Sequence, residues 1–157
     1  MAGKLFMPVA EKKNISIEFN DTTSSTDTWF DAILLEKVFF NLLSNSLKHT
    51  PNGGYIIISS METNTEDIQK PENLGLPAEK ILLIKVEDSG SGIPANMMPR
   101  IFEAFFQAGE KVLGSGIGLN LTKSIIELHG GRIWIDNKEG HGMTVSFTLP
   151  LGKDSYT

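Results

Sequence analysis

The sequence predicts a two-layer α/β (α+β) sandwich, in which a mixed, largely antiparallel sheet of about five strands carries about three helices on one face. Several short segments alternate apolar and polar residues or are continuously apolar, which is typical of strands. Two longer segments repeat their apolar residues at helical spacing, and clusters of glycine and proline separate the segments. The resulting order is strand, helix, two strands, two helices and two strands, which favours one sheet with its helices on a single side.

Length and composition limit the class of protein. The chain has 157 residues, so we expect one domain over 1–157 with its core at about 5–151. A net charge of −5 at pH 7 does not indicate a nucleic-acid-binding surface, which needs clustered Lys and Arg. The absence of cysteine excludes a disulfide framework, Cys-ligated zinc and a thiol nucleophile. No apolar run approaches the roughly 20 residues of a membrane span, so we expect no membrane insertion of this fragment.

The first half of the chain begins with a predicted strand and a long helix. Residues 15–19 alternate and indicate a half-buried strand, and a polar stretch follows them. Residues 31–49 indicate a helix, for which Asp31 is a plausible N-cap. The apolar positions at helical spacing are Leu35, Val38, Phe39, Leu42 and Leu43. The segment 50–54 contains Pro51 and two glycines, which predicts that the helix stops there.

The middle of the chain predicts a long-looped hairpin and a short helix. Residues 55–60 are rich in isoleucine and 81–87 are mostly apolar, so both indicate strands. The polar segment 62–80 between them has no period and indicates an exposed loop insertion. Residues 97–106 indicate a short helix.

The last third predicts a helix followed by a hairpin. Residues 117–129 have helical apolar spacing, and the following pair Gly130-Gly131 predicts the helix end. Segments 132–137 and 143–149 then indicate two strands paired around a turn at 138–142.

A polar stripe lies on the first long helix. At 100° per residue, Asn41, Asn45 and Lys48 fall within roughly 60° of one another. A solvated helix face would also give three polar residues. An amide oxygen is, however, a suitable ligand for Mg²⁺, and a lysine supplies a point charge for phosphate.

Two glycine-rich segments are the other candidate sites. The segment 88–94 begins with Asp88 at the end of a strand, where a carboxylate can accept a hydrogen bond from an exocyclic amine and glycines allow close approach to a flat ring. A turn capped by an aspartate is the alternative. The segment 114–119 opens a helix, where free N–H groups and the helix dipole favour phosphate. It is neither a dinucleotide fingerprint nor a P-loop, and the catalytic loop of protein kinases is missing.

Together, these segments resemble the boxes of sensor histidine kinases, which share the Bergerat ATP-binding fold with certain topoisomerases and chaperones. The resemblance covers about residues 5 to 151, and four boxes occur in the family's order. Residues 41–48 resemble the N box, 88–94 the G1 box, 101–106 the F box and 114–119 the G2 box, and Thr148-Leu149-Pro150 fits the end of such domains.

The resemblance implies a binding site for ATP and Mg²⁺. Asn45 would be the metal ligand, with Asn41 as its supporting neighbour and Lys48 reaching the phosphates. Asp88 would accept a hydrogen bond from the adenine amino group. The residues implied around the adenine are Gly90, Gly92, Ile93 and Thr144, although a plain strand threonine is an equal alternative for the last. The residues implied around the phosphates are Gly114, Ser115, Gly116, Ile117, Gly118 and Leu119.

The segment of about 107–116 would form an ATP lid, anchored by Phe102, Phe105 and Phe106. Two positions depart from the family. His49 stands where an aromatic ring often packs near the nucleotide, and Gln107 stands where many relatives carry an arginine. Lys111 is a candidate to replace that arginine.

Residue 41 helps to choose between reaction classes. Hydrolysing relatives carry a glutamate there as general base, whereas the amide of Asn41 cannot take a proton. Transfer of the γ-phosphoryl group to a histidine needs no such base, so the sequence favours a protein-histidine kinase. Two alternatives stay open: an ATP-gated clamp of the topoisomerase or chaperone type, and a nucleotide-binding interaction module without catalysis.

The phosphate acceptor is predicted to lie outside this chain. The three histidines His49, His129 and His141 are more simply interpreted as structural. The resemblance therefore implies a separate dimerisation domain with the phosphoacceptor histidine, and a response-regulator receiver domain further along a two-component phosphorelay. It also implies a cytoplasmic position for this domain in a membrane-anchored parent protein.

Overall fold

The computed structural model describes residues 2–23, 30–68, 80–103, 118–138 and 140–151. The elements in chain order are α1 (Ala2–Lys12), β1 (Ser16–Asp21), α2 (Ala32–His49), β2 (Tyr55–Asn64), the 3₁₀ helix η1 (Thr65–Asp67), β3 (Lys80–Asp88), the 3₁₀ helix η2 (Ala95–Arg100), α3 (Gly118–Leu128), β4 (Ile133–Lys138) and β5 (Gly142–Pro150). In this part of the chain, five strands form one sheet in the order β1-β2-β3-β5-β4.

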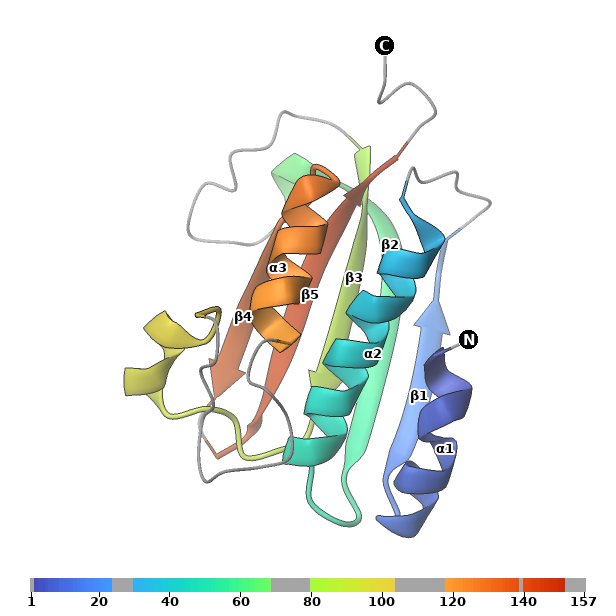
Figure 1. Ribbon diagram of the computed structural model, residues 1–157, viewed down its shortest axis with the longest axis vertical. Helices are drawn as coiled ribbons and strands as arrows, with labels where there is room; N and C mark the ends of the chain where they lie inside the picture. The colour runs from blue at the N-terminus through green and yellow to red at the C-terminus, as the bar shows by residue number, and fades with distance from the viewer. Residues whose placement is uncertain (1, 24–29, 69–79, 104–117, 139, 152–157) are drawn as a thin grey trace.

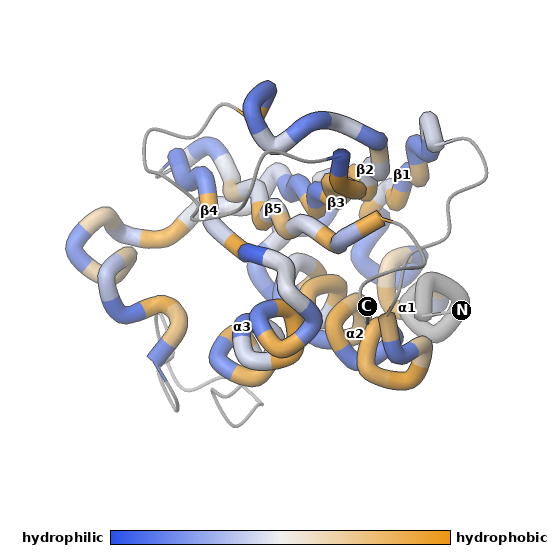
Figure 2. The backbone as a smooth tube through the Cα atoms, turned by 90° about the horizontal axis from the view of Figure 1, so that it is seen from above, coloured by the Kyte–Doolittle hydropathy of each residue, from blue (hydrophilic) through white to orange (hydrophobic). Residues whose placement is uncertain are grey.

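The sheet is mixed, as predicted. Strand β1 runs parallel to β2, and the other neighbouring pairs are antiparallel. Helices α1, α2 and α3 cover one face of this sheet, and the view along the layers shows the strands on one side and the three helices on the other (Figures 1 and 2). The predicted two-layer sandwich is therefore confirmed.

Two helices differ from the sequence prediction. The sequence predicts no helix before residue 15, yet residues Ala2–Lys12 form α1, with Pro8 inside it. The segment predicted as an α-helix over 97–106 instead begins within the 3₁₀ helix η2. Pro99 in this segment lacks the N–H that a regular helical turn needs. Residues 104–106 lie outside the described part. The total of about three helices was right, but α1 takes the place of the short one.

The predicted loop over 62–80 begins later than expected. Strand β2 continues to Asn64, because its second half pairs with the first half of β3, from Ser60 opposite Ile84 to Asn64 opposite Lys80. The polar residues of this extension form a strand because they pair with β3, which is distant in the sequence. Local sequence patterns do not reveal such pairing. Residues 69–79 lie outside the described part.

The core lies between the sheet and the helices. Phe147 of β5 is fully buried and meets the ring of Phe39 of α2 edge-on, with 5.9 Å between ring centroids. The buried apolar residues shared by both layers include Val38 and Leu42 of α2, Ile126 of α3, Ile56 of β2 and Val86 of β3. Burial of each such side chain stabilises the fold by about 1.5–3 kcal/mol before entropy is counted.

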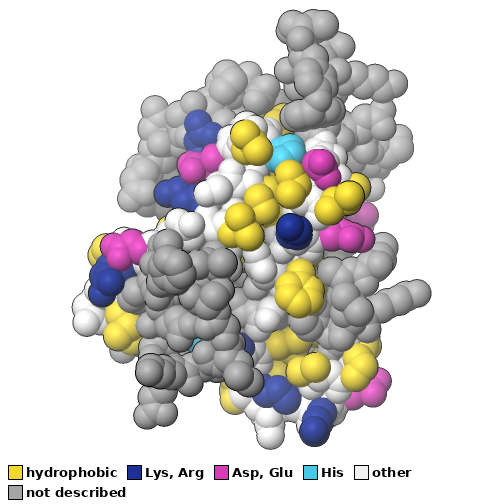
Figure 3. All heavy atoms as spheres, viewed as in Figure 1, with side chains coloured by type: hydrophobic (Ala, Val, Ile, Leu, Met, Phe, Trp, Pro, Cys, Tyr) yellow, Lys and Arg dark blue, Asp and Glu magenta, His cyan; other side chains and the backbone are white. Residues whose placement is uncertain are grey.

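Some apolar side chains stay on the outer surface of the helix layer. Figure 3 shows them gathered over the helix-covered face. On α2 and α3 they are Ile33, Phe40, Leu121 and Leu128, which are between 41% and 77% exposed. Among the helices that the structure describes, none combines the length and apolar character needed to cross a bilayer.

Helix α2 begins as predicted. The carboxylate of Asp31 accepts hydrogen bonds from the N–H groups of Ile33 (2.9 Å) and Leu34 (3.2 Å). These amides have no partner inside the helix, so the cap satisfies both.

Replacing Asp31 with alanine should lower the free energy of unfolding by about 1 kcal/mol, because two helix amides lose their acceptor. Urea denaturation followed by circular dichroism measures the change. Asp31→Asn keeps a capping oxygen and should remain close to the wild type. An equal loss in both variants would rule out capping as the cause.

Candidate functional site

The carboxyl-terminal half of α2 carries the first predicted site residues. The side-chain amide of Asn41 donates to the carbonyl of Gly118 at 3.5 Å and to the hydroxyl of Thr122 at 3.4 Å, so Asn41 faces the start of α3. Asn45 lies one turn further along the same face. Its side chain is half-buried and makes no hydrogen bond to another residue in the described ranges. The predicted role of Asn45 as a metal ligand stays a prediction.

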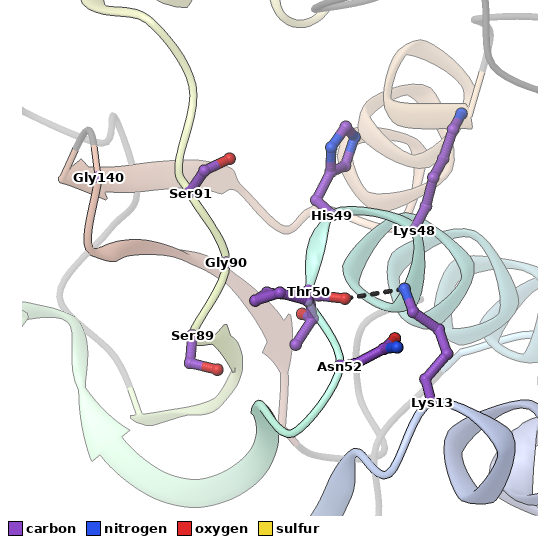
Figure 4. A pocket seen from close by; sticks show the side chains of 10 residues that line it. Lys13, Lys48, His49, Thr50, Asn52, Ser89, Gly90, Ser91 and Gly140 are labelled. Carbon is purple, nitrogen blue, oxygen red and sulfur yellow. Dashed lines mark hydrogen bonds between the residues drawn. The ribbon is translucent and has the colours of Figure 1, made fainter.

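The end of α2 forms one wall of a cavity of about 480 Å³. Lys48 is exposed and His49 is half-buried, and both line this cavity. Figure 4 shows their side chains on one side, with the loop after β3 opposite them at Gly90 and Ser91. The turn between β4 and β5 contributes Gly140. Burial lowers the pKa of His49 below its ordinary value of 6.5, and the neighbouring charges of Lys48 and Lys13 lower it further.

Asp88 is the last residue of β3 and is only 3% exposed. Its carboxylate accepts a hydrogen bond from the N–H of Gly90 at 2.9 Å. The hydroxyl of Ser46 on α2 and the N–H of Met143 on β5 also donate to it. Burial raises the pKa of Asp88 above its ordinary value, because desolvation outweighs these three hydrogen bonds. The carboxylate thus joins β3, α2 and β5 at one point.

The loop after β3 requires glycine at two positions. A Cβ atom on Gly90 would lie 2.5 Å from the carbonyl oxygen of His49, so the loop packs directly on the end of α2. Gly92 has a φ of +71°, and a Cβ atom there would lie 2.7 Å from the carbonyl oxygen of Lys138. Both glycines therefore let the loop lie against neighbouring backbone, whereas their predicted approach to a flat ring stays a prediction.

Asn137 of β4 holds this loop from the other side. Its Oδ1 accepts a hydrogen bond from the N–H of Ile93 at 2.7 Å, and its Nδ2 donates to the carbonyl of Ile93 at 2.6 Å. Ile93 is buried and belongs to the core. Sequence reasoning missed Asn137, because an asparagine near the end of a strand gives no local sign of a partner 44 residues away.

The start of α3 lies beside Asn41. A Cβ atom on Gly118 would be 3.9 Å from the Cβ of Asn41, and the half-buried side chain of Leu119 packs against the core. The remaining predicted residues of this segment lie outside the described ranges: Lys111, Gly114, Ser115, Gly116 and Ile117. The predicted lid over 107–116 also lies there, together with Gln107.

The prediction that Thr144 joins the adenine network is not supported, because Thr144 lies on the other side of the sheet. It is paired with Glu87, whereas Asp88 is paired with Met143. Opposite residues of paired strands share a face, and successive residues alternate faces. The buried Met143, not Thr144, therefore lies on the face of Asp88.

The F-box residue Phe102 and His129 have structural contacts, and His141 lies on the surface. Asn120 of α3 donates to the carbonyl of Phe102 at 2.9 Å, and the ammonium of Lys123 lies 5.2 Å from the centroid of the Phe102 ring. His129 stacks on Phe30 with 3.8 Å between ring centroids, which fits the structural interpretation of this histidine. His141 is exposed in the turn between β4 and β5.

No group of three or more His, Cys, Asp or Glu side chains that could hold a metal ion occurs in the described ranges. Asn45 alone is a weak ligand set. It fits an ion that arrives on phosphate groups, because Mg²⁺ is usually bound by substrate phosphates and one or two protein oxygens.

The fold and these residues define a nucleotide-binding domain of the ATPase and kinase type. The sequence profile of the histidine kinase-, DNA gyrase B- and HSP90-like ATPases matches residues 30–153, and the chain belongs to this family. The predicted family and its ATP-binding type are thereby confirmed.

Within the family, the chain is similar to sensor histidine kinases. It is 35% identical to the alginate biosynthesis sensor protein KinB of Pseudomonas aeruginosa, over 96% of this chain and 23% of that protein. It is 33% identical to the sensor histidine kinase WalK of Bacillus subtilis, over 90% of this chain and 22% of that protein. The chain therefore spans about a quarter of the length of these relatives.

Solved structures give the same picture. The catalytic domain of histidine kinase ThkA superimposes with a TM-score of 0.74 at 29% identity, over 95% of this chain and 87% of that chain. ThkA in complex with the response regulator protein TrrA superimposes with a TM-score of 0.71 at 26% identity, over 98% of this chain and 39% of that chain. The likeness to a catalytic domain covers almost the whole chain.

The His49 titration should have its midpoint below 6.5 in an NMR titration of the imidazole C2 proton, assigned by comparison with His49→Asn. Because the folded-state pKa is lowered, the unfolded state binds the proton more tightly. The contribution of His49 to stability is thus present above pH 6.5 and is lost as the pH falls through the folded-state pKa. A midpoint at or above 6.5 would contradict this environment.

Asn137→Ala should lower the free energy of unfolding by about 1–3 kcal/mol, because both polar groups of the Ile93 backbone lose their partner. The amides of the loop 88–94 should also exchange faster with deuterium. Asp136→Ala changes an exposed neighbour on the same strand and is the matched control. Unchanged loop exchange in Asn137→Ala would mean that this clamp does not hold the loop.

Proposed function

We propose that this domain binds Mg-ATP and supplies the γ-phosphoryl group to a histidine on a separate dimerisation domain, in two-component signal transduction. The observation that carries the proposal is the buried carboxylate of Asp88, which accepts a hydrogen bond from the N–H of Gly90. Gly90 belongs to the glycine-containing loop that follows β3, and this loop packs on the end of α2. The match to histidine kinases supports the same reaction class.

Each group of the nucleotide has a candidate partner on this chain. Asp88 would accept a hydrogen bond from the adenine amino group, with Gly90 and Gly92 beside the ring. Asn45 would supply an amide oxygen to Mg²⁺, and Lys48 would place its charge near the phosphates. A bound Mg²⁺ would neutralise charge on the phosphate oxygens.

The contacts of Asn41 support transfer over hydrolysis. Its amide cannot accept a proton, and its donors face Gly118 and Thr122. Water would therefore find no general base at this position. A neutral imidazole nitrogen already has a free lone pair, so it can form the bond to the γ-phosphorus while the bond to the β–γ bridging oxygen breaks and ADP leaves.

The partners follow from this reaction. The proposal needs a domain that carries the phosphoacceptor histidine, and the exposed apolar side chains on α2 and α3 support docking of a helical partner on that layer. A response-regulator receiver domain would be the next acceptor, and the ThkA–TrrA complex supports this inference by similarity. A cytoplasmic position of this domain in a membrane-anchored parent protein stays a prediction of the family resemblance.

Calorimetric titration with a non-hydrolysable ATP analogue, with and without Mg²⁺, tests the proposal. We expect binding that Mg²⁺ strengthens, and a loss of at least about tenfold in affinity in Asp88→Asn, because a hydrogen bond to a charged group contributes about 1.5–3 kcal/mol. Glu87→Gln, one residue earlier on the opposite face of the sheet, should bind like the wild type.

Binding would justify joining a histidine-bearing helical domain before Met1 to measure phosphotransfer directly. The absence of binding in the wild type would remove the catalytic proposal and favour an interaction module without catalysis. Binding accompanied by rapid hydrolysis would instead favour the ATP-gated clamp.

A further inference from the structure

Lys13 lies outside all four motif segments, yet it binds the C-terminal end of α2. It lies in the short connection between α1 and β1. Its ammonium group donates to the carbonyl of Leu47 at 2.6 Å and to the carbonyl of Thr50 at 2.8 Å, and Figure 4 shows the side chain reaching Thr50. The carbonyl of Lys13 also accepts a hydrogen bond from the N–H of Gly53 at 3.0 Å. Both its side chain and its backbone therefore hold the last turn of α2 and the loop that follows.

The chemistry of a helix end explains why a cation is needed here. The last carbonyl groups of a helix have no partner within it, and they carry partial negative charge. The next residue after the cap Thr50 is Pro51, which has no N–H to fold back onto these carbonyls. The ammonium group of Lys13 satisfies two carbonyls of this end and complements the helix dipole.

The strand pairing brings Lys13 to this place. Strand β1 runs parallel to β2, with Ser16 opposite Tyr55. Parallel strands begin at the same edge of a sheet, so the turn before β1 lies beside the loop before β2. The hydrogen bond from the N–H of Ser16 to the carbonyl of Gly54 at 3.1 Å continues this contact.

The same helix end carries the proposed phosphate and base contacts. Lys48 and His49 belong to the turn that Lys13 holds, and all three residues line the cavity. The loop residue Gly90 packs against the carbonyl of His49. A shift of this helix end would therefore move both walls of the site.

We propose that Lys13 is a positioning residue for the nucleotide, because its ammonium group ties down the helix end from which Lys48 and His49 project. This inference rests on the proposed function. Lys13 acts through the helix and not on the reacting atoms, since two of its donors already bind backbone carbonyls. Its charge is also one of the causes that lower the pKa of His49, which provides a second readout.

The test compares Lys13→Met with Lys13→Arg. Methionine keeps much of the side-chain length but removes the charge and the donors, whereas arginine keeps both. Lys12→Met changes an exposed neighbour and controls for net charge. Ile81→Val shortens a buried side chain of β3 outside the core cluster and controls for a general loss of stability.

We expect Lys13→Met to weaken binding of a non-hydrolysable ATP analogue with Mg²⁺ by about fivefold and to raise the pKa of His49 in the NMR titration. Lys13→Arg should restore most of both values, and the two controls should bind like the wild type. Wild-type affinity in Lys13→Met would overturn the proposal. A loss that Ile81→Val reproduces would also overturn it, because stability alone would then be the cause.

The experiment separates this inference from the proposed function. If the wild type binds no nucleotide, the proposed function fails. The positioning inference is then judged by the His49 titration and by hydrogen exchange of the amides at 47–50. The inference is supported if Lys13→Met, and no other variant, shows faster amide exchange and a raised pKa of His49. It is overturned if neither the exchange nor the pKa of His49 changes in Lys13→Met.

Discussion

Burying the carboxyl group of Asp88 at the end of β3 costs desolvation energy, and the neighbouring elements are arranged to offset that cost. One hydrogen bond comes from the Gly90 amide of its own loop, one from Ser46 on α2 and one from Met143 on β5. Satisfying a buried charge from three elements fixes how they lie relative to one another. This carboxylate therefore links the loop after β3 to α2 and β5, in addition to the apolar packing of α2 on the sheet.

Helix α2 is also fixed in position, because side chains bind the backbone at both of its ends. Asp31 satisfies amides at its start, and Lys13 satisfies carbonyls at its end. The side of α2 near its end can then present Asn45 and Lys48 at constant positions. A helix held at both ends and buried along one side offers a rigid support for polar groups that must meet a charged ligand.

Side chains outside the four motif segments complete the support. Asn137 holds the loop after β3 through both polar groups of Ile93, and Asn120 holds the F box through the carbonyl of Phe102. Each of these contacts, like that of Lys13, pairs a side chain with backbone far away in the sequence. Under the proposed function, the motif residues would provide the chemistry, and these three residues hold the elements that carry them.

Sequence alone determined the five strands, the two long helices and the ATP-binding family, but it missed α1 and the 3₁₀ form of η2. Helical spacing and the Asp31 cap predicted α2, and the order of the boxes predicted the family and the fold. Sequence could not decide whether residue 143 or 144 faces Asp88, because that depends on the register between β3 and β5, nor could it find the partners of Lys13 and Asn137. Local propensity and spacing act over a few residues, and a sequence records them directly. Register and long-range hydrogen bonds form only when distant segments pack together, so the tertiary structure alone decides them.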